Sequence, residues 1–380
     1  MQFSFPTQTV FGAGTLGQLP DLADEIGMKR PMIVTDPGLV QAGLIDQVTS
    51  TLPDYAVFDG VAPNPTEDNV FEGVARYREE RCDGIIGVGG GSSLDAGKVI
   101  GLMTTHDRPL ADYDDNTGGD RLINPDIPPI IAIPTTAGTG SEVGRSGVIT
   151  LKETGRKTVI FSPYLMPSVA LCDPELTRRL PKHITAATGA DAMTHNIEAY
   201  LARGFHPMCD GIALHGAALV YRHLPNAVSN GEEDIEARGQ MMIAASMGAT
   251  AFQKGLGATH SLAHPLSTVA GVPHGLANAI LLPHVLRFNA ETVPERLKDI
   301  GVAMGLDIAS RSSQDAASVT IDAIKDFLRD IGIPAHLADA DVAPDMLPVL
   351  VPKAMEDGCH LLNPRPCTEE DFQRLYETAM

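Results

Sequence analysis

Positive charge and long apolar runs are scarce in this sequence, and each scarcity excludes a class of protein. The chain has 28 Lys and Arg against 48 Asp and Glu, a formal net charge of −20. Phosphate backbones and anionic lipids repel such an excess of negative charge, so we expect neither nucleic acid nor a membrane as a partner. No apolar run approaches the roughly 20 residues of a membrane-spanning helix. The hydrophobic fraction of 43% is ordinary for a soluble enzyme.

Paired cysteines are also missing. There are five cysteines, an odd number, and no C-x-x-C pair occurs. Scattered thiols of this kind are typical of a reducing compartment. The first residues, MQFSFPTQTV, have neither the basic start nor the apolar run of a signal peptide. We therefore expect a cytoplasmic enzyme with free thiols at Cys82, Cys172, Cys209, Cys359 and Cys367.

At 380 residues the chain is longer than one compact core usually holds, so we expect two domains. Residues 1–180 alternate short apolar runs with helix-like segments such as 70–80 and 95–103, which predicts a parallel sheet covered by helices. The predicted strands are 32–35, 84–88, 129–133 and 168–171. The stretch 112–129 is rich in Asp, Gly, Asn and Pro and indicates a surface loop.

The pattern changes near Leu180-Pro181-Lys182, after which β-branched alternation disappears. Residues 181–380 therefore form a predicted all-α domain, with helices at 185–201, 211–224, 235–252, 277–288 and 318–331.

Two glycine motifs compete for the role of phosphate loop. Gly12-x-Gly14-x-x-Gly17 fits the dinucleotide fingerprint, but the segment before it, 8–11, is too short and polar for a central strand. The run from Gly89 to Ser93 directly follows an apolar strand and precedes a helix. Consecutive glycines let the backbone approach a pyrophosphate, which the helix N-terminus can bind. We therefore favour Gly90, Gly91 and Ser92 over the alternative of a plain tight turn.

Two further segments end at the same predicted edge of the sheet. Thr135 and Thr136 begin a hydroxyl- and glycine-rich loop after the strand 129–133, and open α/β sheets bind ligands at that edge. Asp36 ends another strand. It could accept hydrogen bonds from an adenine ribose, which favours NAD over NADP, or it could equally cap the turn before Pro37-Gly38.

Asp and His residues at helical spacing indicate a metal site. Asp191 and His195 are separated by four residues and so share a helix face, and His260, His264 and His274 follow later. Taken singly, an Asp/His pair is more often a surface hydrogen bond. The segments that carry these residues are otherwise rich in Ala, Met, Leu and Gly, and a cation can stabilise buried polar groups. Imidazoles with a carboxylate suit Zn²⁺ or Fe²⁺.

The remaining histidines lack a clustering partner, so we expect surface or core roles for them. The exception is His360, which we keep as a candidate to line the pocket; the others are His106, His183, His206, His215, His223 and His284.

Together the motifs resemble the iron-containing (group III) alcohol dehydrogenase family over essentially the whole chain. The marks of the resemblance are VAPNPT from Val61, GGGSSLDAGK from Gly89, IPTTAGTGSE from Ile133, ATGADAMTHNIEAY from Ala187 and HSLAHPLSTVAGVPHGLANAILLPHVLRFN from His260. The resemblance implies a dehydroquinate synthase-like architecture. An α/β Rossmann-like nucleotide-binding domain would precede an all-α metal-binding domain, with the active site in the cleft between them.

The resemblance also implies roles for individual residues. One divalent cation, Fe²⁺ with Zn²⁺ as the alternative, would be held by Asp191, His195, His260 and His274. His264 would lie beside the nicotinamide and act in catalysis. The early motif Gly12-x-Gly14-x-x-Gly17 would then not be the phosphate loop. Gly144 is a departure from the family, because relatives often carry there a Thr that contacts the cofactor. NAD would be bound by Asp36, Asn64, Gly90, Gly91, Ser92, Thr135, Thr136, Lys157 and Leu176.

Within the family, the segments AFQKGLGATHSL and CDPELT and the C-terminal tail are similar to 4-hydroxybutyrate dehydrogenases. This similarity implies interconversion of a primary alcohol and its aldehyde, with Lys254 and Arg145 as candidate carboxylate partners. Two rival interpretations remain, a metal-free reductase of the maleylacetate reductase type and a non-redox cyclising protein of the dehydroquinate-synthase type. Family members are commonly homodimers or larger.

Overall fold

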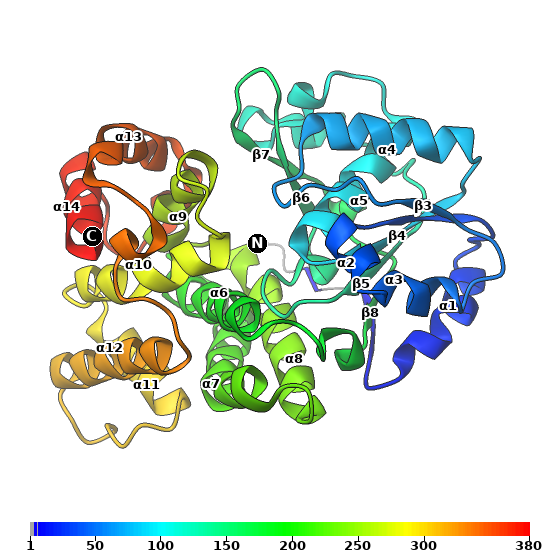
Figure 1. Cartoon of the computed structure of the whole chain (residues 1–380). Helices are drawn as coiled ribbons and strands as arrows, with labels where there is room; N and C mark the ends of the chain where they lie inside the picture. Colours follow the sequence, from blue (N-terminus) through cyan, green and yellow to red (C-terminus); the bar gives the residue numbers. More distant parts are fainter. Residues whose placement is uncertain (1–3, 6) are drawn as a thin grey trace. The chain divides into compact units, whose positions relative to one another are not determined.

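The computed structural model describes residues 4, 5 and 7–380, which divide into two compact units (Figure 1). One unit consists of Phe5–Thr136 and Gly140–Arg178, and the other of Arg179–Met380 with Ala137–Thr139 and Ser4. Each unit has its own hydrophobic core. None of the described helices is long and apolar enough to cross a membrane.

The first unit is built on a six-stranded parallel sheet with the strand order β1-β8-β5-β4-β2-β3. The four predicted apolar runs are its inner strands, which confirms the predicted parallel α/β fold. The strands are β1 Gln8–Phe11, β2 Pro31–Val34, β3 Ala56–Phe58, β4 Gly84–Gly89, β5 Ile130–Pro134 and β8 Val169–Cys172.

Alternate residues of the inner strands face opposite sides of the sheet. Met32 and Ile85 belong to one core, whereas Ile33 and Ile86 belong to another. A parallel sheet covered on both faces needs an apolar residue at every position, which is why these strands read as continuous apolar runs. The connecting helices are α1 Leu19–Glu25, α2 Pro37–Gln41, α3 Leu44–Thr49, α4 Glu67–Glu79 and α5 Gly91–Thr105 (Figure 1).

Two parts of this unit differ from the expectation. An antiparallel hairpin, β6 Ser146–Thr150 with β7 Lys157–Phe161, packs beside α5 and was not predicted. The predicted surface loop 112–129 begins with short 3₁₀ turns, and Tyr113 there is 1% exposed. The polar composition of the segment did not predict this contact, because the single buried side chain of Tyr113 is enough to fix the loop to the core.

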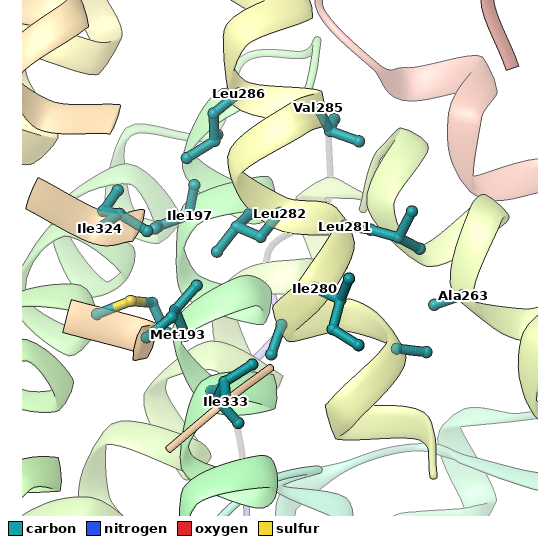
Figure 2. Close-up of a cluster of buried hydrophobic side chains, with 14 of the residues drawn as sticks. Met193, Ile197, Ala263, Ile280, Leu281, Leu282, Val285, Leu286, Ile324 and Ile333 are labelled. Atoms are coloured by element: carbon teal, nitrogen blue, oxygen red, sulfur yellow. The ribbon is translucent and has the colours of Figure 1, made fainter. Parts of the chain in front are cut away.

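The second unit is helical, as predicted. Figure 2 shows how side chains from separate helices meet in its core, with Met193 and Ile197 near Leu282 and Ile324. The helices are α6 Lys182–Leu201, α7 Pro207–Asn230, α8 Ile235–Ala251, α9 Ala258–Val269, α10 His274–Asn289, α11 Pro294–Ala303, α12 Ser313–Asp330, α13 Leu347–Glu356 and α14 Glu369–Ala379.

Candidate metal centre and nucleotide-binding edge

The triple-glycine motif forms the turn from β4 into α5. Gly89 has a φ of 150°, and a Cβ there would lie 2.6 Å from the Cβ of Ser93, so the turn requires glycine. Gly90 is the N-cap residue of α5, and no side chain caps the helix. The first amide groups of α5 are therefore available at a helix N-terminus, an arrangement that suits a phosphate.

The neighbouring loops meet this turn at the carboxyl ends of the strands. The amide of Thr135 donates to the carbonyl of Gly89 at 2.9 Å. A Cβ on Gly90 would lie 3.4 Å from Oγ1 of Thr136. Ser92 Oγ donates to the carbonyl of Pro63 at 2.6 Å, next to the exposed Asn64. The structure thus brings together six of the nine predicted nucleotide-site residues, namely Asn64, Gly90, Gly91, Ser92, Thr135 and Thr136.

The other three lie in different surroundings. Asp36 caps α2, because its Oδ1 accepts from the amides of Gly38 at 2.9 Å and Leu39 at 3.1 Å, while Oδ2 lies 3.4 Å from Ser93 Oγ. Leu176 is buried in the core, and Lys157 begins β7. The structure therefore bears out the capping alternative for Asp36 and leaves Oδ2 facing the turn.

The early glycine motif is already bound by a protein carboxylate. The amides of Gly14 and Leu16 donate to the two carboxylate oxygens of Asp173 at 3.1 and 2.9 Å. A phosphate would have to displace this carboxylate, which argues against this motif as the phosphate loop.

A buried lysine connects helix α5 with the segment 141–146. Lys98 of α5 is fully buried and donates to Ser141 Oγ at 2.7 Å and to the carbonyl of Ser146 at 2.9 Å. Ser141 Oγ in turn donates to Asp95 at 2.5 Å. A Cβ at Gly144 would lie 3.6 Å from Lys98 Nζ, so this glycine is next to the buried lysine. The sequence placed Lys98 inside a motif but did not predict its burial.

Three helices of the second unit bring the predicted ligands together. α6 contributes Asp191 and His195, α9 contributes His260, and α10 begins at His274. One ligand atom from each of the four residues can be chosen so that all lie within 4.8 Å of one another. The close approach of α10 to α6 depends on Gly275, since a Cβ there would lie 2.3 Å from the carbonyl oxygen of Ala187.

Hydrogen bonds orient two of the imidazoles. His195 Nδ1 lies 3.3 Å from the carbonyl of Gly138, and His260 Nδ1 lies 2.7 Å from Oε2 of Glu198. When Nδ1 donates to these oxygens, Nε2 carries the lone pair that a metal needs. Burial lowers the pKa of His195, which keeps its ring neutral.

Three of the four candidate ligands contact one amide group. The amide Nδ2 of Asn278 lies 2.8 Å from Asp191 Oδ1, 3.3 Å from His260 Nε2 and 3.1 Å from His274 Nε2. A single donor group in contact with three acceptors shows that these atoms face a common position. A ligand atom of His195 lies within 4.8 Å of ligand atoms of these three residues. The cluster thus offers three imidazoles and a carboxylate, which fit a divalent cation of the Zn²⁺ or Fe²⁺ type.

The charges of the site also fit a cation. Asp191 and Glu198 are 2% and 4% exposed. Burial works against ionisation of Asp191, but attraction to the neighbouring imidazoles in their protonated form and a hydrogen bond from Asn278 outweigh it and hold the pKa of this carboxyl below its usual range. Burial likewise opposes ionisation of Glu198, but hydrogen bonds from His260 and Thr259 keep its pKa low. Two buried negative charges require positive charge nearby, which a divalent cation would supply.

Glu198 was missed by the sequence analysis although a signal existed. It lies seven residues after Asp191 and three after His195, so all three side chains share one helix face. Its carboxylate accepts from the amides of Gly257 at 3.0 Å and Thr259 at 2.7 Å as well as from His260. Glu198 therefore orients His260 and fixes the start of α9.

The substitution Glu198→Gln is expected to weaken metal affinity by about 10- to 100-fold, as for other carboxylates that orient a histidine ligand. Competition with a chromogenic chelator measures the change. Glu236→Gln, at an exposed position of α8, is the matched control. Equal affinity in Glu198→Gln and the control would contradict an orienting role.

Lys254 and His360, two further residues singled out in the sequence, both lie in buried contacts of this unit. Lys254 is 8% exposed and donates to Asp210 Oδ1 at 2.5 Å and to the carbonyl of Tyr200 at 2.8 Å. Its charge is already paired with Asp210, which argues against a role as carboxylate partner of a substrate. His360 is buried, with Nε2 lying 3.2 Å from the carbonyl of Met355. It packs against Phe372 in the core.

The chain combines a Rossmann-like sheet and a glycine loop with a helical unit that holds three histidines and a carboxylate. This combination is typical of enzymes that use a nucleotide cofactor and a metal ion. Comparison with known proteins identifies the class. Residues 6–174 match the family described as iron-containing alcohol dehydrogenase, and residues 185–380 match the C-terminal part of the Fe-containing alcohol dehydrogenase family. The chain belongs to the iron-containing alcohol dehydrogenase family.

Individual relatives agree with this assignment. The chain is 42% identical to 4-hydroxybutyrate dehydrogenase from Cupriavidus necator, with 97% of each protein covered. The crystal structure of a 1,3-propanediol oxidoreductase is 40% identical and superposes with a TM-score of 0.95 over 100% of both chains. Sulfoacetaldehyde reductase from Bifidobacterium kashiwanohense in complex with NAD⁺ is 30% identical, with a TM-score of 0.90, 100% of this chain and 98% of that chain covered.

Family membership confirms the predicted fold class and the predicted class of enzyme, an oxidoreductase of the alcohol dehydrogenase type. It also confirms the predicted cofactors as NAD and a divalent metal, for which the chain has a fitting cluster of Asp and His side chains. A small-molecule alcohol as substrate agrees with the relatives.

Proposed function

We propose that this protein interconverts a primary alcohol and its aldehyde with NAD(H), using one divalent cation held by Asp191, His195, His260 and His274. The observation that carries the proposal is that one ligand atom from each of these four side chains lies within 4.8 Å of the others, in a chain of this family. The domains would be 1–180 for the nucleotide and 181–380 for the metal. Fe²⁺ is the proposed ion, with Zn²⁺ as its substitute.

The cofactors and the protein would divide the chemistry. A cation at this site supplies Lewis-acid polarisation of an alcohol oxygen, and NAD supplies the hydride acceptor. The side chains hold both groups in place. Asp191 and the imidazoles would set the position of the cation and the net charge of the site. The α5 N-terminus and the loop of Thr135 and Thr136 fix the pyrophosphate and thereby the nicotinamide.

His264 is the proposed proton acceptor. It lies one helical turn after His260, and its ring stacks on that of His274 with centroids 5.3 Å apart. It is therefore adjacent to the ligand set, while its side chain stays 31% exposed and can exchange protons with solvent. Such a residue can accept the hydroxyl proton of the alcohol and release it to water.

The proposed nucleotide contacts extend from the adenosine to the nicotinamide. Their common feature is an origin in loops that follow parallel strands or in the adjoining hairpin, where open α/β sheets bind cofactors. The residues are Asp36, Asn64, Gly90, Gly91, Ser92, Thr135, Thr136, Lys157 and Leu176.

The substitution Asp36→Gly is expected to shift cofactor preference toward NADP, because it removes a carboxylate that would repel the 2′-phosphate. Loss of the α2 cap costs only a few tenths of a kcal/mol when glycine replaces aspartate, so the fold should tolerate the change. Steady-state kinetics with both cofactors measure the preference. An unchanged ratio of kcat/KM for NAD and NADP would show that Asp36 is only a helix cap.

The proposed substrate pair is 4-hydroxybutyrate and succinate semialdehyde. The similarity to 4-hydroxybutyrate dehydrogenase supports it. Arg145 remains the candidate carboxylate partner, with its guanidinium over the ring of Phe161 at 5.2 Å. A panel of alcohols and aldehydes followed by NADH absorbance tests the proposal. We expect turnover of ω-hydroxy acids or diols, and absence of NAD-dependent turnover with every member would overturn it.

Two alternative functions make different predictions. A metal-free reductase would turn over NADH after all metal has been removed, and the complete set of four ligand-type side chains argues against it. A cyclising protein would bind NAD without net reduction, so the same absorbance panel separates it.

We further propose a cytoplasmic homodimer or larger homo-oligomer. The free cysteines fit a reducing compartment. Strand β1 is at an edge of the sheet, and Phe11 on it is 43% exposed, which makes this edge a candidate for contact between copies.

A further inference from the structure

His264 shares a hydrogen bond with a carboxylate that is distant in sequence. Its Nδ1 lies 2.7 Å from Oδ2 of Asp357, although 93 positions separate the two residues. Asp357 stands between α13 and the 3₁₀ turn Gly358–Leu362. The Asp357 side chain is 21% exposed, so the pair lies partly away from solvent. This geometry is that of an Asp–His pair in which the carboxylate selects one imidazole tautomer.

The carboxylate itself is held firmly. Its Oδ1 accepts from Ser261 Oγ at 2.7 Å and from the amide of Cys359 at 2.9 Å. Ser261 and His264 are three residues apart on α9 and so share a face. Burial alone would raise the pKa of Asp357, but the hydrogen bonds from His264, Cys359 and Ser261 outweigh it and hold that pKa well below its usual range. The carboxylate is therefore charged and fixed.

We propose that Asp357 is a positioning residue that holds His264 with its proton on Nδ1 and its lone pair on Nε2. This inference rests on the proposed function of His264. In alcohol oxidation Nε2 accepts the hydroxyl proton, the C–H bond breaks with both electrons leaving as hydride to NAD, and the C–O double bond forms. The imidazolium, stabilised by the Asp357 carboxylate, then returns the proton to water.

The substitution Asp357→Asn tests this assignment on the metal-loaded enzyme. Asparagine can keep Oδ1 as the cap of the 3₁₀ turn, but it directs an N–H₂ group at His264 Nδ1 and so favours the wrong tautomer. We expect kcat to fall by about 10²- to 10⁴-fold, as when other Asp–His pairs are broken in this way, with little change in KM for NAD and in metal content. Asp345→Asn, at an exposed position, is the control.

A double-mutant cycle separates positioning from a structural role. If Asp357 acts through His264, then Asp357→Asn should cost nothing further once His264→Ala is present. Full additivity of the two losses would overturn the proposal, because it would mean that Asp357 serves the fold alone. Loss of metal from Asp357→Asn would overturn it as well.

A spectroscopic measurement tests the pair without relying on catalysis. Long-range ¹⁵N–¹H spectra of the histidine-labelled, zinc-loaded full chain report the tautomer of His264. We expect an Nδ1–H tautomer in the wild type and an Nε2–H tautomer in Asp357→Asn. The same tautomer in both would overturn the positioning role even if alcohol turnover is found. The expected change in a protein without alcohol turnover would place the failure in the proposed function instead.

Discussion

Replacing Asp191 with asparagine is expected to remove the cation and lower kcat/KM for alcohol oxidation by at least about 10³-fold. Lewis-acid polarisation contributes several kcal/mol, and each 1.4 kcal/mol is a factor of ten in rate. The substitution keeps the volume of a side chain that is 2% exposed but removes the only negative charge in the proposed ligand set. Elemental analysis of the purified variant and NADH absorbance measure the two effects.

The control for this variant is Asp322→Asn, since Asp322 is an exposed partner of Arg287. It should retain both metal and activity. The variant Asp191→Asn should remain folded, because asparagine can still bond to Asn278 Nδ2, which now donates to Asp191 Oδ1 at 2.8 Å. Full metal content with normal activity in Asp191→Asn would contradict the proposed ligand set.

Removing the metal with a chelator is expected to abolish turnover and to destabilise the protein. A ligand that binds only the folded state contributes about 4 kcal/mol to the free energy of unfolding when its concentration is about 1,000 times its Kd. Loss of that contribution should lower the thermal midpoint, and added Fe²⁺ should restore both stability and activity. Calorimetry and the absorbance assay on one sample measure both effects.

The variant Asp191→Asn again serves as the control, since the chelator should not lower its midpoint further. Activity that persists after elemental analysis shows no metal would instead support a metal-free reductase on the same fold.

The inner strands of the sheet could be predicted from the sequence because they are buried. Strands β2, β4, β5 and β8 are buried on both faces, so each is a continuous apolar run. The hairpin β6–β7 alternates between half-buried and buried residues and contains Gly147, which gives a much weaker signal.

The candidate site could be predicted only in part. Asp191 and His195 share a helix turn, so their spacing predicts a common face. Their convergence with His260 and His274 depends on how three helices pack, and in the sequence analysis it came from the family resemblance. Asp357 left no such signal, since its partner Ser261 is 96 positions away and an aspartate before a turn is commonly a cap. Tertiary contacts of this kind are not encoded in local spacing.

Anomalous scattering at the iron absorption edge would test the central claim most directly. The protein would be purified and crystallised without oxygen in the presence of Fe²⁺. We expect one strong anomalous peak at bonding distance from Asp191, His195, His260 and His274. The described residues contain another cluster of metal-ligand type, His264 with Asp357 and Cys359. A peak at that cluster alone, or no peak in crystals of an active enzyme, would contradict a metal site at Asp191, His195, His260 and His274.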